Sequence, residues 1–178
     1  QGSGARSRLG EHPRKMTTPL SELTTMRVGG TPAELLEALS RDQLIEFATG
    51  VWATGDDWLV LGGGSNIVAA DDLSELTVIR TLNRGIDRDG TRLRVQAGEN
   101  WDEFVAFTVD AGLTGVEALS GIPGSVGAAP VQNIGAYGQE VSETITRLEF
   151  VEYPSGDIRV LENSELGFGY RDSIFKRG

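Results

Sequence analysis

The sequence contains no cysteine and a single histidine, His12, among its 178 residues. Without cysteine there are no disulfides, thiolate metal ligands, iron–sulfur clusters or thiol nucleophiles, and the chain fits a reducing compartment. His12 lies in a terminal stretch rich in Gly, Ser and Arg, so the folded part has no histidine for a triad, a metal pair or a general base. We therefore expect no metal site and no catalysis by histidine or cysteine.

Basic residues are scarce outside the first sixteen residues. Residues 1–16 hold 4 of the 16 Lys and Arg but 1 of the 26 Asp and Glu, which leaves 12 basic against 25 acidic side chains, a net charge of −13. With this negative charge, residues 17–178 are not expected to bind nucleic acid or an anionic membrane, since both need basic patches. Nor does any run reach the roughly 18 continuous apolar residues of a membrane span. We expect a soluble, cytoplasmic protein with a disordered leader or expression remnant over 1–16.

Helix and strand signals alternate along the rest of the chain, which predicts a mixed α+β class. Residues 40–55 begin with a capping-box pattern and carry a helical apolar period, and residues 100–112 repeat this arrangement. Strand-like runs and one probable hairpin lie around these helices, at 59–61, 77–81, 93–97 and 147–162. The charged, turn-rich stretch 82–90 predicts a boundary between two lobes, over 17–82 and 83–178.

Three consecutive glycines follow the apolar run 58–61 in the stretch "LGGGSN". They match neither a dinucleotide-binding fingerprint nor a phosphate-binding P-loop, because the third fingerprint glycine and the Gly-Lys-Ser/Thr ending are both missing. Two interpretations stay open: a flexible linker or plain turn, or a turn whose successive N–H groups form a concavity for a phosphate or diphosphate.

Residues 119–138, "LSGIPGSVGAAPVQNIGAYG", contain no charged residue. Five glycines and two prolines forbid a regular element over this length, so the backbone must be irregular. Irregular backbone that is buried needs hydrogen-bond partners, and a bound polar ligand is one such partner. The alternative is a loop folded on its own core, in which Gln132 and Asn133 satisfy their neighbours. The run Pro123–Gly127 also resembles a serine-nucleophile elbow, but its first glycine and a histidine base are missing.

The run "FGYRDSIFK", residues 168–176, gathers Tyr170, Arg171, Asp172 and Lys176. Arginine is suited to bidentate capture of a carboxylate or phosphate. A surface pair between Arg171 and Asp172 is the structural alternative.

The motifs "TTMRVGG", "LGGGSN", "AGENW", the uncharged loop 119–138 and "FGYRDSIFK", in this order and spacing, resemble the flavin-binding part of the UDP-N-acetylenolpyruvoylglucosamine reductase family of bacterial peptidoglycan synthesis. The resemblance runs from about Pro19 to Lys176. It implies a two-lobed α+β FAD-binding domain of the vanillyl-alcohol-oxidase/p-cresol-methylhydroxylase type. It also implies tightly bound FAD, NADPH as hydride donor and UDP-N-acetylglucosamine enolpyruvate as the substrate that is reduced to UDP-N-acetylmuramate.

By match of motif, the resemblance also implies a set of site residues. The FAD diphosphate would be wrapped by Gly62, Gly63, Gly64, Ser65 and Asn66. The flavin and its chain would be lined by Ile122, Pro123, Gly124, Gly127, Gln132, Asn133, Gly135 and Ala136. Arg171 would be the catalytic arginine that holds the substrate carboxylate, with Tyr170 and Gln132 as substrate contacts. With a flavin carrying the redox chemistry, a missing histidine is no obstacle.

The family's proton-donating serine and its glutamate partner lie in a substrate-binding part that follows the arginine motif. We expect this part to be absent from the chain, and the chain alone to be incapable of normal turnover. Two other functions stay open: a different FAD-dependent oxidase or dehydrogenase of the same fold, or a nucleotide-binding module without redox chemistry.

Overall fold

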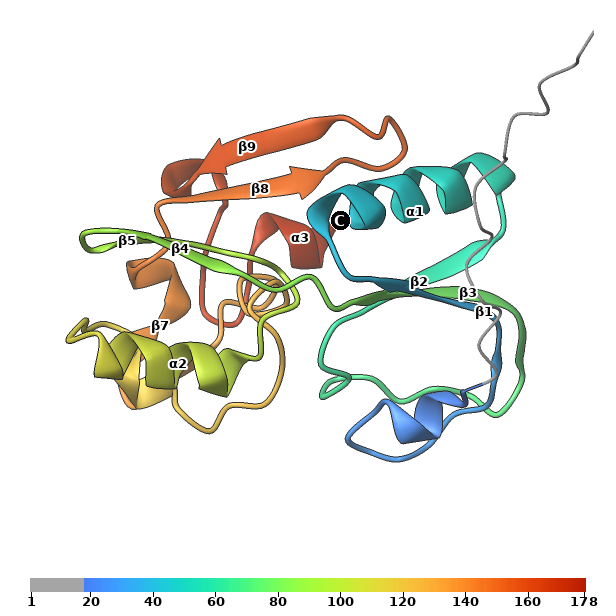
Figure 1. Cartoon of the computed structure of the whole chain (residues 1–178), viewed down its shortest axis with the longest axis horizontal. Helices are drawn as coiled ribbons and strands as arrows, with labels where there is room; N and C mark the ends of the chain where they lie inside the picture. Colours follow the sequence, from blue (N-terminus) through green and yellow to red (C-terminus); the bar gives the residue numbers. More distant parts are fainter. Residues whose placement is uncertain (1–17) are drawn as a thin grey trace, which may run out of the picture.

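The computed structural model describes residues 18–178, so the predicted leader at 1–16 and His12 lie outside the described part. Figure 1 shows a three-stranded sheet covered by helix α1 on one side of the molecule and helix α2 with the β4–β5 hairpin on the other. In this view the β8–β9 hairpin lies at the top, with its tip directed toward α1, and the C-terminal helix α3 lies below it near the centre. The three-stranded sheet and α1 form the first subdomain, whose elements are long. The elements from β4 onward form the second subdomain, in which most elements are short and many residues lie in turns.

The first subdomain is a parallel sheet in the order β1–β3–β2, made of β1 (Pro32–Ala38), β3 (Leu73–Thr81) and β2 (Asp57–Leu61). Successive residues of β1 face opposite sides, as the period of a strand requires. Leu35 packs with Leu20, Leu61 and Val78 on one face. Leu36 packs on the other face with residues of α1. Both faces are covered, which is the usual state of a parallel sheet.

Helix α1 (Arg41–Thr54) confirms the helix predicted over 40–55. The Ser40 side chain accepts a hydrogen bond from the Gln43 N–H at 3.2 Å, and Gly55 ends the helix in a left-handed conformation. The predicted strands at 59–61 and 77–81 are confirmed within β2 and β3. Strand β1 was not predicted from the sequence. Both of its faces are covered, so its residues show no clear alternation of apolar and polar side chains.

The second subdomain begins with β4 (Ile86–Asp89) and β5 (Arg92–Val95), an antiparallel pair. The stretch 82–90, predicted as a boundary, therefore includes a strand. Helix α2 (Trp101–Asp110) follows, capped by the Asn100 side chain as its sequence pattern predicted. A core cluster around Trp101 and Leu119 holds α2 against the uncharged loop.

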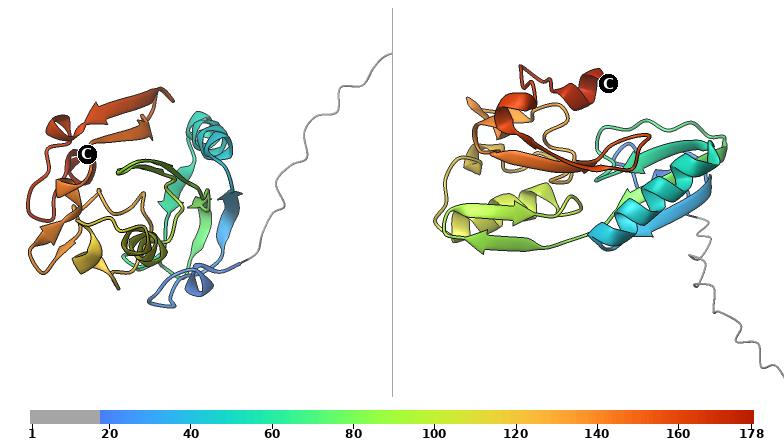
Figure 2. Two further views of the ribbon diagram at one scale, coloured as in Figure 1. Left: turned by 60° about the vertical axis from the view of Figure 1, so that its left-hand side comes forward. Right: turned by 90° about the horizontal axis from the view of Figure 1, so that it is seen from above.

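The remaining elements are short, and the views in Figure 2 show the red hairpin extending over both subdomains. Strands β8 (Arg147–Val151) and β9 (Ile158–Glu162) form the predicted hairpin. Its tip residue Tyr153 packs on Trp52 and Trp58, with ring centroids 5.3 and 5.5 Å away. The other elements are η1 (Leu20–Glu22), η2 (Glu117–Leu119), β6 (Gly135–Ala136), β7 (Gln139–Glu140), η3 (Val141–Glu143), η4 (Asn163–Glu165) and α3 (Ile174–Arg177).

Two other kinds of feature are absent from residues 18–178. No helix there combines the length and apolarity that a bilayer crossing needs. No group of three or more His, Cys, Asp or Glu side chains in that range is placed to hold a metal ion.

Candidate functional site

The glycines at 62–64 form a tight turn at the end of β2, and the linker interpretation is wrong. Gly64 has a φ of +67°, and a Cβ built on it would lie 2.2 Å from the Leu23 carbonyl oxygen. A Cβ on Gly63 would lie 2.8 Å from Gly124 Cα. Neither distance leaves room for a side chain. Glycine is therefore present here because other backbone approaches the turn from two sides.

This turn has several unused backbone donors. Within residues 18–178, the N–H groups of Gly63, Gly64, Ser65 and Asn66 donate no hydrogen bond to another residue. Gly63 and Asn66 are exposed, so a ligand can reach this end of the turn. Successive unpaired N–H groups in a turn form a concavity that suits an anion.

The start of the uncharged loop is held by side chains of helix α2. The Asp102 carboxylate accepts hydrogen bonds from the Gly121 N–H at 2.7 Å and the Ser120 hydroxyl at 2.9 Å. These two bonds, the backbone one first, hold the pKa of Asp102 below its ordinary value of 3.8. The indole N–H of Trp101 donates to the Leu119 carbonyl at 3.0 Å, and its backbone N–H donates to Gly124 at 3.0 Å.

The two glycine-rich stretches meet at Gly63 and Gly124. The Ser65 hydroxyl donates to the Pro123 carbonyl at 3.3 Å and so bridges them. Next to this contact, Ser125 is 6% exposed, and its hydroxyl is buried without a partner among the described residues. A hydroxyl pressed against Gly62 does not have the exposed geometry of a nucleophile elbow, which agrees with the missing histidine base.

This junction fits the diphosphate of a dinucleotide cofactor. It offers neutral N–H donors and two backbones whose close approach excludes any Cβ, as a ligand-wrapping turn requires. Because these donors carry no charge, they suit a protein body with a net charge of −13.

At its far end, the loop is held by Asn133, which is fully buried. Its side-chain N–H groups donate to Glu140 and to the Gly169 carbonyl, both at 2.9 Å, and its side-chain oxygen accepts from the Ser142 N–H at 3.1 Å. The interpretation that Asn133 satisfies its neighbours is thus correct for this residue. These contacts place the 169–171 turn beside the loop.

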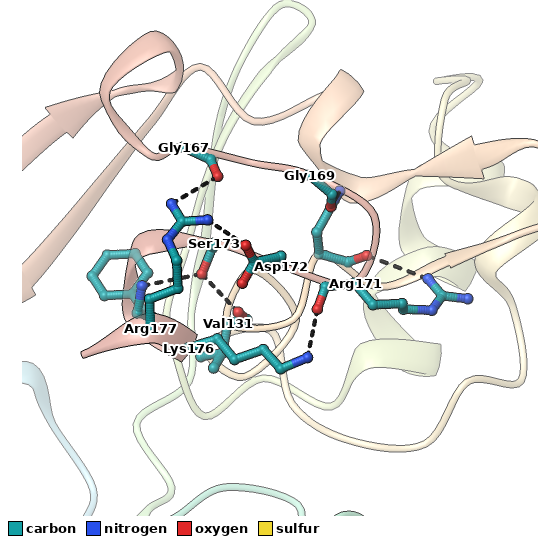
Figure 3. A network of polar contacts seen from close by, with 10 residues as sticks. Val131, Gly167, Gly169, Arg171, Asp172, Ser173, Lys176 and Arg177 are labelled. Carbon is teal, nitrogen blue, oxygen red and sulfur yellow. Dashed lines mark hydrogen bonds and ion pairs between the residues drawn. The ribbon is translucent and has the colours of Figure 1, made fainter.

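The guanidinium of Arg171 lies against the same end of the loop. It donates to the Asn133 carbonyl at 3.3 Å and to the Gly135 carbonyl at 2.5 Å. In Figure 3 the guanidinium of Arg171 points away from Asp172, whose carboxylate pairs with Arg177. The alternative of an Arg171–Asp172 surface pair is therefore wrong. Arginine has five N–H donors, so these two contacts leave others for a ligand.

A polar network holds the Arg171 turn in place (Figure 3). The buried Ser173 hydroxyl donates to the Val131 carbonyl at 2.6 Å, and the Lys176 ammonium donates to the Arg171 carbonyl at 2.8 Å. Arg171 itself has a φ of +52°, which is rare for a residue with a side chain. Its Cζ lies 5.5 Å from the centroid of the Tyr170 ring, and Tyr170 is 85% exposed.

The structure thus places the predicted site residues in two groups, which lie at different parts of the uncharged loop. Residues 62–66 with Pro123 and Gly124 form the first group, and Asn133, Gly135 and Arg171 form the second. Gly127 has a packing reason of its own, since a Cβ there would lie 2.6 Å from the Ala97 Cβ. Ile122 packs half-buried on the core of the second subdomain, Gln132 is half-buried, and Ala136 lies in β6.

Sequence reasoning missed one segment of this site. The Thr25 N–H donates to the Gly64 carbonyl at 2.9 Å, so residues 20–27 lie directly against the glycine turn. The signal was present, because "TTMRVGG" is one of the motifs that carry the resemblance, yet it contributed no predicted site residue. Asp102 was also missed, since nothing in sequence marks a first-turn helix carboxylate as an anchor for a loop.

The fold is the two-lobed α+β FAD-binding fold of the vanillyl-alcohol-oxidase/p-cresol-methylhydroxylase type. A family model described as an FAD binding domain matches residues 32–162, and the chain belongs to this family. The 6-hydroxy-D-nicotine oxidase of Arthrobacter nicotinovorans shares the fold, with a TM-score of 0.61 at 22% identity over 76% of this chain and 31% of that one.

More similar proteins confirm the resemblance to the FAD-binding part of UDP-N-acetylenolpyruvoylglucosamine reductase. The protein of that name from Leifsonia xyli is 59% identical over 170 residues, which cover 92% of this chain and 45% of the relative. The reductase structure from Thermus caldophilus has a TM-score of 0.73 and 34% identity, over 90% of this chain and 56% of that one. The chain spans about half the length of these relatives.

Proposed function

We propose that the chain is the FAD-binding portion of a reductase that converts UDP-N-acetylglucosamine enolpyruvate to UDP-N-acetylmuramate with NADPH as hydride donor. The observation that carries the proposal is the junction of the two glycine-rich stretches, where four successive N–H groups have no partner in the described part of the chain. The names of the relatives support the substrate. As the resemblance implies, we also propose a place in cytoplasmic peptidoglycan synthesis, and so in cell-wall biogenesis, cell shape and cell division.

In this proposal, residues 62–66 hold the diphosphate of FAD through their N–H groups, and Pro123 and Gly124 form the facing wall. The turns from Ile122 to Ala136 line the rest of the cofactor. FAD would supply the hydride-transfer chemistry when bound. The protein's own contribution is to bind, orient and exclude water, and each of these roles suits a site built from neutral backbone. The two lobes, 17–82 and 83–178, would close over the cofactor from both sides.

Arg171 would hold the substrate carboxylate, with Tyr170 and Gln132 beside it. Its contacts with Asn133 and Gly135 fix the guanidinium in place while leaving N–H donors free. A preorganised cation beside the carboxylate stabilises negative charge that develops on the enolpyruvyl group during reduction. A lysine would supply the charge without the forked donors.

The first test is a visible absorption spectrum of the purified protein before and after FAD is added and the excess removed. We expect a retained flavin spectrum with FAD and none with riboflavin, which lacks the diphosphate. A folded sample that retains no FAD would overturn the proposed cofactor site. Binding of ADP by such a sample would favour the nucleotide-binding module instead.

The second test places this chain in a complete enzyme by replacing the matching part of the Leifsonia xyli reductase. In this hybrid, Arg171→Lys should lower kcat/KM for the enolpyruvyl substrate by about 100-fold or more, because an oriented donor is lost. Reduction of FAD by NADPH should stay within about threefold, since Arg171 is assigned to the other half-reaction. Arg92→Lys, on the exposed strand β5, is the matched control and should change neither rate.

A hybrid that oxidises NADPH with bound FAD but ignores the UDP-sugar would overturn the substrate assignment. That outcome would favour a different FAD-dependent oxidase or dehydrogenase of the same fold.

A further inference from the structure

The segment 20–30 folds over the glycine turn, although it precedes the residues that the FAD binding domain model matches. Leu20, fully buried, anchors it in the core below the sheet. Its backbone closes on itself through the Ser21 N–H, which donates to Gly29 at 3.1 Å, and on the turn through the Thr25 N–H, which donates to Gly64 at 2.9 Å. The segment is therefore a fixed wall of the site.

A cleft lies between this wall and the turn. It is lined by residues 21–25, Arg27 and Gly63. Gly63 is exposed, and its N–H is unpaired within residues 18–178. The cleft thus includes Gly63, one of the residues assigned above to the diphosphate.

Arg27 is the cationic residue of this cleft. Its backbone N–H donates to the Thr24 carbonyl at 3.2 Å, and the Thr24 hydroxyl donates to the Val28 carbonyl at 3.2 Å, so a short turn fixes the backbone at Arg27. Arg27 has a φ of +53°. Within residues 18–178 its guanidinium forms no ion pair, whereas Arg41 and Arg80 bind carboxylates at 2.7 and 2.8 Å.

A positive φ costs free energy in a residue with a side chain. It persists where the surrounding structure imposes it, often at functional sites. Within residues 18–178, the non-glycine residues with positive φ are Arg27, Asn133, Tyr137 and Arg171. Three of these four belong to the uncharged loop or the Arg171 turn. Arg27 shares their backbone state and lies at the other glycine-rich stretch.

We infer that Arg27 provides the positive charge that binds the diphosphate of the ligand held by residues 62–66. The inference rests on the proposed FAD site and adds a residue to it. Glu22 also lines the cleft, and the rest of the protein is acidic. A diphosphate held by neutral N–H donors alone would therefore be repelled by the surrounding carboxylates. A guanidinium in the same cleft offsets that repulsion and offers charge-assisted hydrogen bonds to phosphate oxygens.

The test measures the dissociation constant of FAD by titration of the cofactor-free protein, at about 0.05 and 0.3 M NaCl, two concentrations that differ in screening length. Arg27→Gln should weaken binding about tenfold at the lower salt, the loss expected for one charge-assisted contact. Its affinity should also depend less on salt than that of the unchanged protein. Arg92→Gln removes the same charge from an exposed position on β5 and should stay within about twofold.

Two further variants keep the test decisive if Arg27→Gln folds poorly. Arg27→Lys should regain most of the affinity, because the charge is restored. Glu22→Gln should tighten binding about threefold, because it removes the repulsive carboxylate from the cleft. Thermal unfolding of each cofactor-free variant reports whether the fold itself has changed.

The outcomes separate this inference from the proposed function. If the unchanged protein binds no FAD, the proposed function fails. If it binds FAD but Arg27→Gln behaves like Arg92→Gln, or if Glu22→Gln leaves the affinity unchanged, the assignment of Arg27 is wrong.

Discussion

The two glycine-rich stretches of this protein use glycine for different reasons. Within residues 18–178, the N–H groups of residues 63–66 stay unpaired, and Gly63 and Gly64 admit other backbone at distances that exclude a Cβ. In residues 119–138 many backbone groups are paired inside the protein, as when the Val126 N–H donates to Glu99 and the Gly127 N–H donates to Ala97, both at 2.9 Å. Two of its five glycines, Gly121 and Gly138, have nothing within 4 Å of where a Cβ would lie.

This difference shows that a glycine count alone does not identify a ligand site. The short turn is a donor surface, built by close approach of three chain segments. The long loop is mainly a self-supporting wall, held at its start by Asp102 and at its end by Asn133. A ligand needs both, because free donors bind it and a rigid wall positions it.

The largest effect is expected for Gly64→Ala. A Cβ at Gly64 would meet the Leu23 carbonyl oxygen at 2.2 Å, so the variant should lose more than about 4 kcal/mol of stability, or fail to fold. The matched control is Gly138→Ala. Gly138 also has positive φ, +82°, but nothing lies within 4 Å, so only the backbone cost of about 1 kcal/mol applies. Urea unfolding measures both variants. Equal losses of unfolding free energy would contradict the distinction between the two stretches.

Asn133→Ala should lower the free energy of unfolding by about 3 kcal/mol, because a fully buried side chain is lost and three half-buried groups lose their hydrogen-bond partner. Gln132→Ala, one residue earlier and half-buried, should cost less than about 0.5 kcal/mol. Urea unfolding monitored by tryptophan fluorescence measures both. A small loss for Asn133→Ala would show that the loop does not depend on this anchor.

The stability that Asp102 contributes at the start of the uncharged loop should depend on pH. The lowered pKa of Asp102 means that its carboxylate contributes stability above the pKa of the unfolded chain, near 3.8, and loses it as pH falls through the lower folded value. Asp102→Asn should therefore be less stable than the unchanged protein at pH 7, and the difference should shrink toward pH 3. Urea midpoints across this range measure it, and a difference independent of pH would refute the role of the charged form.

The smallest effect concerns a glycine in neither stretch. Gly50 lies inside helix α1, and a Cβ there meets nothing within 4 Å. Gly50→Ala should stabilise the protein by about 0.5–1 kcal/mol, because alanine loses less backbone freedom in a helix. A rise in the urea midpoint checks this. Destabilisation would mean that space around a glycine is a poor guide to its role in this fold.

Much of the fold could be predicted locally. Both long helices carry their own caps, Ser40 and Asn100, and the β8–β9 hairpin has a turn sequence between two strand-like runs. Strand β1 escaped prediction because a strand buried on both faces shows no alternation. Strand β4 escaped because its residues Ile86–Asp89 are mostly charged, and it is formed by pairing with β5.

The site was predicted in part. The glycine turn and the uncharged loop were recognised from their unusual composition, but their contact through Gly63 and Gly124 joins residues about sixty positions apart. No local pattern encodes such a contact. For the same reason the wall formed by residues 20–27, and with it Arg27, became visible only beside Gly64.

The sequence by itself determined the elements with local signals, the absence of cysteine and histidine chemistry in the body, and the family to which the chain belongs. Tertiary structure alone decided which glycines are sterically required, which N–H groups stay unpaired, and that Arg171 binds the carbonyls of Asn133 and Gly135 instead of Asp172. The physical reason is the separation along the sequence of the residues that interact. Caps and turns depend on neighbours within a few residues, whereas close approach and hydrogen-bond pairing depend on segments that meet only when the chain has folded.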